Sequence, residues 1–191
     1  MYRIQRQSKV LDMLEREGEV DVNSLSDIFD TSKETIRRDL REMEKSGLLK
    51  GTHGGAVPVG NRFGQGYEYP LFARTIKKYD EKQIICQEAV KLLEEGDTIF
   101  LDNSSTTLSF IRYIPKNIGL NIITNSIQIL LEAGNFNNPN LTIISMGGEL
   151  NIKNYSVSGI LSNSYSRGIF PDKAIISCRG LTKNSGITDA S

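Results

Sequence analysis

Apolar residues recur at helical spacing in three stretches near the start of the chain. They predict a helix over 4–17, a second helix capped by Asn23 after a short alternating strand at 19–22, and a third helix from Ser32 to about Ser46. The apolar residues expected to pack these helices into a small core are Leu14, Leu25, Ile28, Phe29, Ile36 and Leu40. Three short helices in this order are typical of a helix-turn-helix domain.

The pattern changes twice after the third helix. Two short extended pieces flank a glycine-rich turn and predict a hairpin, which completes a winged helix-turn-helix domain over 1–57. Residues 58–80 contain Pro58, Pro70 and three glycines with little periodicity. This composition is typical of an interdomain linker, here one that leads into a helix.

From residue 81 onward, apolar segments of strand length alternate with helical stretches. The expected strands lie at 98–101, 120–124, 141–146 and 174–178, and the expected helices lie at 81–94, near 106–114, 126–133 and 160–169. Strands that alternate with helices build a mostly parallel sheet. The sequence therefore predicts a second domain of α/β class over 81–191.

Composition indicates the class of protein and its compartment. Of the 191 residues, 38% are apolar and 24% are charged, which fits a globular protein. No apolar run approaches the roughly 20 residues of a membrane helix, and the charged N-terminus is not a signal peptide, so we expect a cytoplasmic protein. Cys86 and Cys178 lack metal-ligand spacing and are expected to be two buried thiols in a reducing compartment. Neither a metal nor a cofactor is implied.

The charge balance at first argues against a nucleic-acid partner. The net charge is zero, with 23 basic and 23 acidic residues, whereas DNA-binding domains usually carry a basic excess. The third predicted helix nevertheless has one basic face, formed by Arg37, Arg38, Arg41 and Lys45, opposite an apolar face formed by Ile36, Leu40 and Met43. Such a stripe is often only a solvated face. Here it lies on the third helix of a helix-turn-helix pattern and a glycine-rich hairpin follows, so we expect a helix that reads the major groove, with the acids largely elsewhere.

Two short blocks of this region resemble a known family. Residues 32–40 read Ser-Lys-Glu-Thr-Ile-Arg-Arg-Asp-Leu and residues 53–56 read His-Gly-Gly-Ala, which looks like the signature of the DeoR family of bacterial transcription repressors. The resemblance implies that Ser32 caps the recognition helix and that the hairpin is a wing whose glycines let the backbone approach phosphate. The DNA-binding residues that it implies are Ser32, Lys33, Thr35, Arg37, Arg38, Arg41, His53, Gly54 and Gly55.

The second half carries a candidate anion site. Residues 102–107, Asp-Asn-Ser-Ser-Thr-Thr, follow one expected strand and open a helix, where hydroxyls and backbone N–H groups either bind an anion or simply cap the helix. This block and those around 124–126, 147–149 and 180–189 come in the order seen in the DeoR sensor domain, which is similar to ribose-5-phosphate isomerase and the CoA-transferase group. The effector-binding residues implied by the resemblance are Asp102, Ser104, Ser105, Thr106, Thr107, Thr124, Asn125, Gly147, Gly148 and Arg179.

Two departures from the family pattern bear on the sensor domain. Ser104 stands where many members have glycine, so its side chain narrows the phosphate loop or adds a donor. The chain also ends at Ser191, where family members continue. We therefore expect a sensor domain without its C-terminal part, from a fragment or a natural truncation, which exposes a sheet edge and responds poorly to effector.

Three functions remain open at this stage. The first is a repressor that binds operator DNA as a homo-oligomer, a dimer or larger, and is controlled by a phosphorylated sugar. The second is an enzyme acting on sugar phosphates, with Asp102, Glu149 and Asp189 as candidate bases, which leaves the helix-turn-helix without a role. The third is an architectural DNA-binding protein, which leaves the ordered blocks after residue 100 unexplained. A lipase-like oxyanion loop at His53 lacks the partner elbow motif. We expect the first function and assign no catalytic residue.

Overall fold

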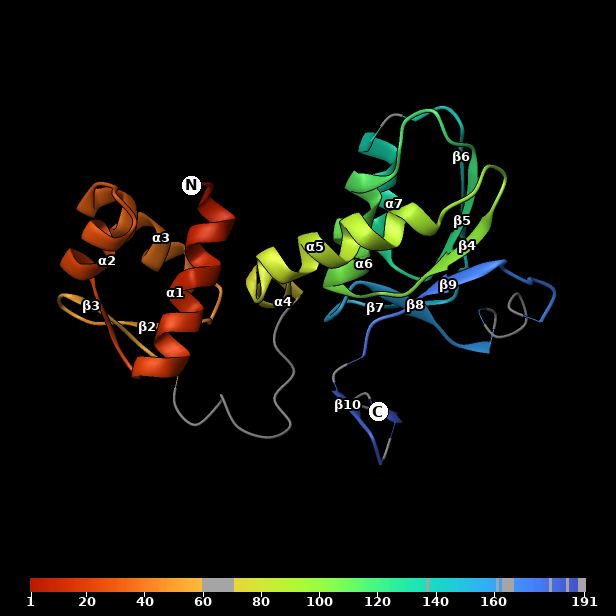
Figure 1. Cartoon of the computed structure of the whole chain (residues 1–191). Helices are drawn as coiled ribbons and strands as arrows, with labels where there is room; N and C mark the ends of the chain where they lie inside the picture. The colour runs from red at the N-terminus through yellow and green to blue at the C-terminus, as the bar shows by residue number, and fades with distance from the viewer. Residues whose placement is uncertain are drawn as a thin grey trace. The chain divides into compact units, whose positions relative to one another are not determined.

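The computed structural model describes residues 1–59, 71–136, 138–160, 162, 167–178, 180–184 and 186–188, without the side chains of 71 and 72. The chain divides into two compact units, Met1–Glu81 and Lys82–Ser191 (Figure 1). Each unit has its own hydrophobic core.

The first unit is a winged helix-turn-helix. Its helices are α1 (Arg3–Glu17), α2 (Val22–Ile28), α3 (Lys33–Lys45) and α4 (Leu71–Ile76). Its strands are β1 (Val20–Asp21), β2 (Lys50–Gly51) and β3 (Gly55–Val57), which form an antiparallel sheet in the order β1-β3-β2. The three helices and the hairpin expected from the sequence are thus confirmed.

Local sequence signals explain where α1 ends and where α3 begins. Gly18 ends α1 with a left-handed φ of 80°, a conformation that costs glycine little. The Ser32 hydroxyl caps α3 by accepting a hydrogen bond from the Thr35 backbone N–H at 3.2 Å. The turn between α2 and α3 places Asp30 in the left-handed region, φ 47°, which Asp tolerates better than most residues.

The predicted start of α2 was wrong. Asp21, not Asn23, is the cap, since its Oδ1 accepts hydrogen bonds from the backbone N–H groups of Asn23 at 2.9 Å and Ser24 at 3.0 Å. These bonds to the ionised carboxyl lower the pKa of Asp21, the Ser24 bond most strongly. The alternating strand therefore ends at Asp21, and Val22 is already helical.

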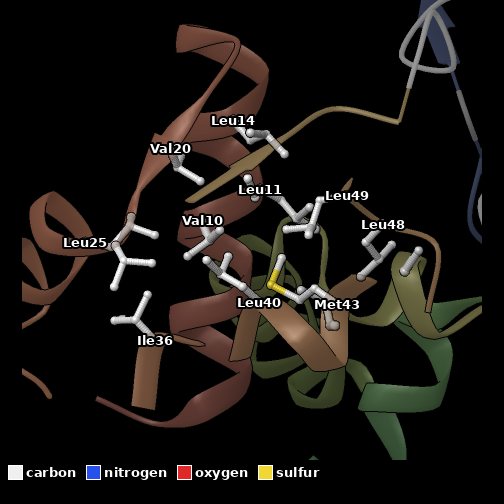
Figure 2. Packing of buried hydrophobic residues seen from close by; sticks show 14 residues of the cluster. Val10, Leu11, Leu14, Val20, Leu25, Ile36, Leu40, Met43, Leu48 and Leu49 are labelled. Atoms are coloured by element: carbon white, nitrogen blue, oxygen red, sulfur yellow. The ribbon is translucent and has the colours of Figure 1, made fainter. Parts of the chain in front are cut away.

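The core of the first unit lies between α1, α2 and α3 (Figure 2). Leu14, Leu25 and Ile36 are fully buried there. Ile28, which we expected in this core, is instead 58% exposed, because α2 is only seven residues long and ends at Ile28. The other expected core residues, Phe29 and Leu40, do pack against the cluster.

The segment after the described gap belongs to the same core. Ala73 and Ile76 of α4 are each 1% exposed and pack in the cluster that contains α1. Polar contacts extend this packing along α1: Lys77 pairs with Glu15 at 2.6 Å, and the Tyr79 backbone N–H donates to the Ser8 hydroxyl at 3.3 Å. The end of the region expected to be a linker is thus a helix docked on α1.

The second unit is an α/β sheet. Its parallel strands are β4 (Thr98–Leu101), β5 (Leu120–Thr124), β6 (Leu141–Ser145) and β9 (Lys173–Ile175), in the order β6-β5-β4-β9. Helices α5 (Tyr79–Ala89), α6 (Ser105–Phe110) and α7 (Ile127–Phe136) lie on one side of it in Figure 1, with short 3₁₀ turns at Val90–Leu92 and Ile111–Tyr113. Two hairpins complete the unit: β7 (Glu149–Asn151) with β8 (Ser156–Ser158), and β10 (Gly180–Thr182) with β11 (Gly186–Thr188).

Some details of the second unit differ from expectation. The strand expected over 174–178 starts at Lys173 and ends at Ile175. Half of the helix expected near 160–169 lies outside the described residues, and residues 167–169 at its end are not helical. Cys86 is buried, and this burial raises the pKa of its thiol to about 11. Cys178 is exposed, not buried as we expected, because it lies in the loop beyond β9.

Candidate DNA interface and effector site

The exposed face of α3 and the wing enclose a groove in the first unit. Arg37, Arg38, Arg41 and Lys45 are all exposed on α3. The groove, of about 250 Å³, is lined by Arg37 and Arg41 from α3 and by His53, Gly54 and Gly55 from the wing, together with Val22, Asn23, Leu40, Glu44, Gly51 and Thr52. Five of the nine sequence-predicted DNA residues therefore meet in one place. Arg38 lies on α3 outside the groove lining.

Two of the three predicted DNA-binding residues at the start of α3 also cap the helix. The hydroxyls of Ser32 and Thr35 lie 2.9 Å apart and share the cap of the helix. Lys33, the first helical residue, is exposed. The first turn of α3 is thereby held in shape, and N-terminal residues of a recognition helix are the ones that reach base edges.

Two acidic residues of this interface were missed by sequence reasoning. Glu34 lies on the cationic face, with its carboxylate 3.7 Å from Arg37 and 3.3 Å from Arg41. Glu44 accepts a hydrogen bond from the Gly51 backbone N–H at 2.7 Å, which ties α3 to the wing. The i, i+3 spacing of Glu34 and Arg37 was the available signal for the first contact. Nothing local in the sequence pointed to the second.

The wing glycines are explained partly by the sheet itself. A Cβ on Gly55 would lie 1.8 Å from the carbonyl oxygen of Val20, so only glycine allows β3 to pair with β1. Gly54 is exposed at the turn, and its carbonyl accepts a hydrogen bond from the Val22 backbone N–H at 2.8 Å. The wing is therefore joined to the start of α2 as well as to α3.

The candidate effector site lies at the carboxyl ends of the parallel strands. Strand β4 is flanked by β5, which follows it in the chain, and by β9, which comes much later, so the strand order reverses between β4 and β9. Ligands of open α/β sheets bind at such a reversal, outside the carboxyl ends of the strands. Asp102 lies at this point: its Oδ2 accepts a hydrogen bond from the Ser177 backbone N–H at 2.7 Å.

The hydroxyl block after Asp102 forms a tight internal network. Ser104 caps α6, and its hydroxyl lies 2.8 Å from that of Thr107. The Thr107 hydroxyl also donates to Asp102 Oδ1 at 2.9 Å, and Thr107 is buried. Ser105 is buried, whereas Thr106 is half-buried. The structure thus gathers all four predicted hydroxyl residues and commits two of them to the cap.

The neighbouring strands bring the remaining predicted residues to the same edge. Thr124 is fully buried at the end of β5, where its hydroxyl donates to the Leu101 carbonyl at 2.8 Å. Next to it, Asn125 Oδ1 is buried, and no donor within the described residues reaches it. Gly147 and Gly148 follow β6; a Cβ on Gly148 would lie 2.3 Å from the Ser158 carbonyl oxygen, so β8 requires glycine there. Arg179 lies outside the described residues.

Within the described residues, no group of three or more His, Cys, Asp or Glu side chains is arranged to hold a metal ion. No described helix is both long and apolar enough to cross a lipid bilayer.

The fold and the two sites together define a class: a DNA-binding winged helix joined to an α/β ligand-binding unit. Comparison with known proteins agrees. The DeoR-like helix-turn-helix domain matches residues 6–61, and the DeoR C-terminal sensor domain matches residues 77–191. The chain therefore belongs to the DeoR family of helix-turn-helix transcription regulators.

Curated relatives match nearly the whole chain. It is 33% identical to the transcriptional regulator GolR of Listeria innocua, over 99% of this chain and 72% of the relative. It is 34% identical to the L-fucose operon activator of Escherichia coli (97% and 74%) and 31% identical to the transcriptional repressor AccR of Agrobacterium fabrum (95% and 69%). Among solved structures, ribose 5-phosphate isomerase A of Methanocaldococcus jannaschii is 25% identical over 36% of this chain and 32% of that chain, with a TM-score of 0.32.

Proposed function

We propose that this regulator is a cytoplasmic, non-catalytic repressor that binds operator DNA as a homo-oligomer and is released by a phosphorylated sugar. One observation carries the DNA half of the proposal: Arg37 and Arg41 of α3 face the wing residues His53 and Gly54 across one groove. Exposed arginines on a recognition helix contact phosphates and guanine edges. A small winged helix rarely gives enough affinity alone, which supports an oligomer on repeated half-sites.

The effector half of the proposal is supported by the edge of the sheet where Asp102 lies. We assign contacts with sugar hydroxyls to Asp102 and Asn125. A carboxylate accepts hydrogen bonds from hydroxyls, and so does a buried amide oxygen that no donor among the described residues reaches. The hydroxyls of Ser104 and Thr107 are already bonded to one another. We therefore assign the phosphate to the loop that they shape, with Thr106, half-buried at its rim, as the side-chain donor.

Relatives named as an activator and as a repressor both resemble this chain. We propose repression because occupancy of an operator by the oligomer is by itself sufficient to block transcription. The sugar-operon name of the fucose relative supports a carbohydrate effector here.

The test uses the full chain and DNA upstream of its own gene. The segment of this DNA that the protein prefers is taken as the operator. Binding to it and to a scrambled sequence is measured by fluorescence anisotropy at several salt concentrations, and sugars and sugar phosphates are then titrated in. We expect preference for the operator and release by one phosphorylated sugar at lower concentration than by its unphosphorylated form. Equal affinity for both DNAs at every salt concentration contradicts operator recognition. Equal release by sugar and sugar phosphate contradicts the phosphate site.

A further inference from the structure

A buried ion pair joins α1 to the inner face of the recognition helix. Arg6 Nε donates to Asp39 Oδ2 at 2.5 Å, and the two side chains are 9% and 1% exposed. Asp39 follows Arg37 and Arg38 directly in α3, yet it lies among the apolar residues of the inner face. The pair therefore connects the helix that carries the DNA-reading cations to the fixed scaffold of the first unit.

Stability does not account for this pair. Removing two charges from water carries a desolvation cost that often equals or exceeds the attraction between them, and apolar replacements of similar volume are often neutral or stabilising. Asp39 Oδ1 adds to that cost, because no donor within the described residues reaches it. Ile36, Leu40 and Met43 already supply apolar packing on the same face of α3.

The ion pair adds a preferred orientation of α3 about its axis. Apolar packing is non-directional, so it tolerates small rotations of α3 about its axis, whereas a charge-assisted N–H···O bond has a preferred length and angle. At about 6 Å from the helix axis, a rotation of about 20° moves a side-chain atom by about 2 Å, more than the spread of hydrogen-bond lengths. Arg37 and Arg41 would then miss the base edges that they are aimed at.

A second contact fixes the position of α3 along α1. Glu42, three residues after Asp39, accepts a hydrogen bond from Gln7 Nε2 at 3.3 Å, and Arg3 lies 3.3 Å from the same carboxylate. Two anchor points three residues apart on α3, both held by the first turns of α1, restrain sliding as well as rotation.

We propose that Asp39 is a positioning residue for DNA recognition: through Arg6 it sets the rotation of α3, and thereby the discrimination between operator and other DNA. The inference rests on the proposed operator binding. It predicts a separation of properties, because the pair is dispensable for folding and for attraction to phosphate but required for reading sequence.

The experiment replaces the pair by apolar residues in the full chain, Arg6→Met with Asp39→Leu, which leaves the net charge unchanged. We expect a midpoint of unfolding equal to or above that of the parent, unchanged affinity and salt slope on scrambled DNA, and a loss of operator preference of about tenfold or more, as expected when one or more base contacts are lost. The matched control is Glu15→Leu with Lys77→Met, which removes an ion pair that joins α1 to the residue after α4. It should keep the full preference.

Full operator preference in the folded Arg6→Met, Asp39→Leu variant overturns the inference. If that variant does not fold, Arg6→Lys decides: it keeps the charge but not the Nε donor, so positioning predicts a reduced preference in a folded protein, and an unchanged preference overturns the proposal. Failure of operator binding itself is seen separately, in the parent protein, which would then show no preference between the two DNAs.

Discussion

Shortening the Ile76 side chain to that of alanine tests whether α4 is part of the DNA-binding unit. Ile76 is 1% exposed and packs in the core that contains α1 and α3, although a stretch of chain separates it from both in sequence. We expect Ile76→Ala to destabilise a protein of residues 1–81 as a core substitution does. Ile28→Ala, at a position that is 58% exposed in the same unit, is the matched control.

The magnitude follows from burial. Replacing a fully buried isoleucine by alanine removes apolar contacts and leaves a cavity, which costs about 2–5 kcal/mol. For a unit of this size, each kcal/mol lowers the melting temperature by about 4–8 °C, so Ile76→Ala should lower it by roughly 10 °C or more. Ile28→Ala should change stability by about 0.5 kcal/mol, as surface substitutions usually do.

Unfolding of the three proteins by urea and by heat, followed by far-ultraviolet circular dichroism, gives both quantities. A fragment ending at residue 59 supplies a further comparison, since it lacks α4 altogether and should be less stable than residues 1–81. Equal effects of Ile76→Ala and Ile28→Ala would refute the assignment of α4 to this core. The first unit would then be the three helices and the wing alone.

Three other substitutions test the two sites and one structural ion pair. Arg38→Ala should weaken operator binding by about 1–3 kcal/mol if Arg38 reads a base edge. A phosphate contact alone would instead lower affinity on all DNA and reduce the salt slope by about one. Anisotropy at several salt concentrations separates the two, and unchanged affinity removes Arg38 from the interface. Thr106→Glu should abolish sugar-phosphate binding in calorimetry by placing a like charge at the phosphate, while DNA binding persists; retained effector binding would place the phosphate elsewhere. The hydrogen bond from Lys173 is the main cause that lowers the pKa of Asp97 below its ordinary 3.8, so its stabilisation is complete above that value and is lost as pH falls through the lowered folded-state pKa. Asp97→Asn should therefore reduce stability at neutral pH and flatten the acid loss in urea titrations, and an unchanged acid profile would contradict this origin.

The DNA-binding half was predictable because its signals are local. Ser32 and Gly47 bracket α3 in the sequence, and its apolar and basic residues separate cleanly by helical period. One error was Ile28, which was expected in the core but is exposed, and the other fell at the start of α2, where two residues suit the same position. Asp21 and Asn23 are both good caps, and only the backbone geometry of β1 selects Asp21.

The second half was predictable in its strands but not in its hairpins. Strands β4, β5 and β6 are mainly apolar, and β4 and β5 alternate or run through buried positions, as expected for strands of a parallel sheet. The β7–β8 hairpin has three-residue strands that are mainly polar, and residue 155 makes its turn with a left-handed φ of 57° despite being tyrosine. No periodicity marked its strands, although Asn154 is of a residue type common in turns.

Contacts between distant segments were beyond the reach of sequence patterns. A six-residue helix such as α4 is too short to show a period, and Ala73 and Ile76 are ordinary in a linker. The Arg6–Asp39 pair joins residues 33 positions apart, and Asp39 in isolation reads as one more solvated charge on a polar helix. The resemblance to the family places Asp39 in a shared motif but implies no role for it.

The contacts of the acidic residues on α3 explain how a protein without net charge presents a cationic surface to DNA. The helix carries five basic and four acidic residues, so its composition alone is nearly balanced. Two of the acids are engaged away from the groove, Asp39 by Arg6 in the core and Glu42 by Arg3 and Gln7, while Glu44 lines the groove with its carboxylate bonded to the backbone of the wing.

Glu34 is the acid of α3 that forms ion pairs with the exposed cations, Arg37 and Arg41. Exposed pairs of this kind contribute little to stability and are screened by salt, so the two arginines can leave Glu34 for phosphate at small cost. The carboxylate that remains repels the DNA backbone unless a base amino group, such as that of cytosine, donates to it. We therefore expect the acids of α3 to serve two ends: Asp39 and Glu42 hold the cations in position, and Glu34 disfavours binding to DNA that offers phosphates without the matching base.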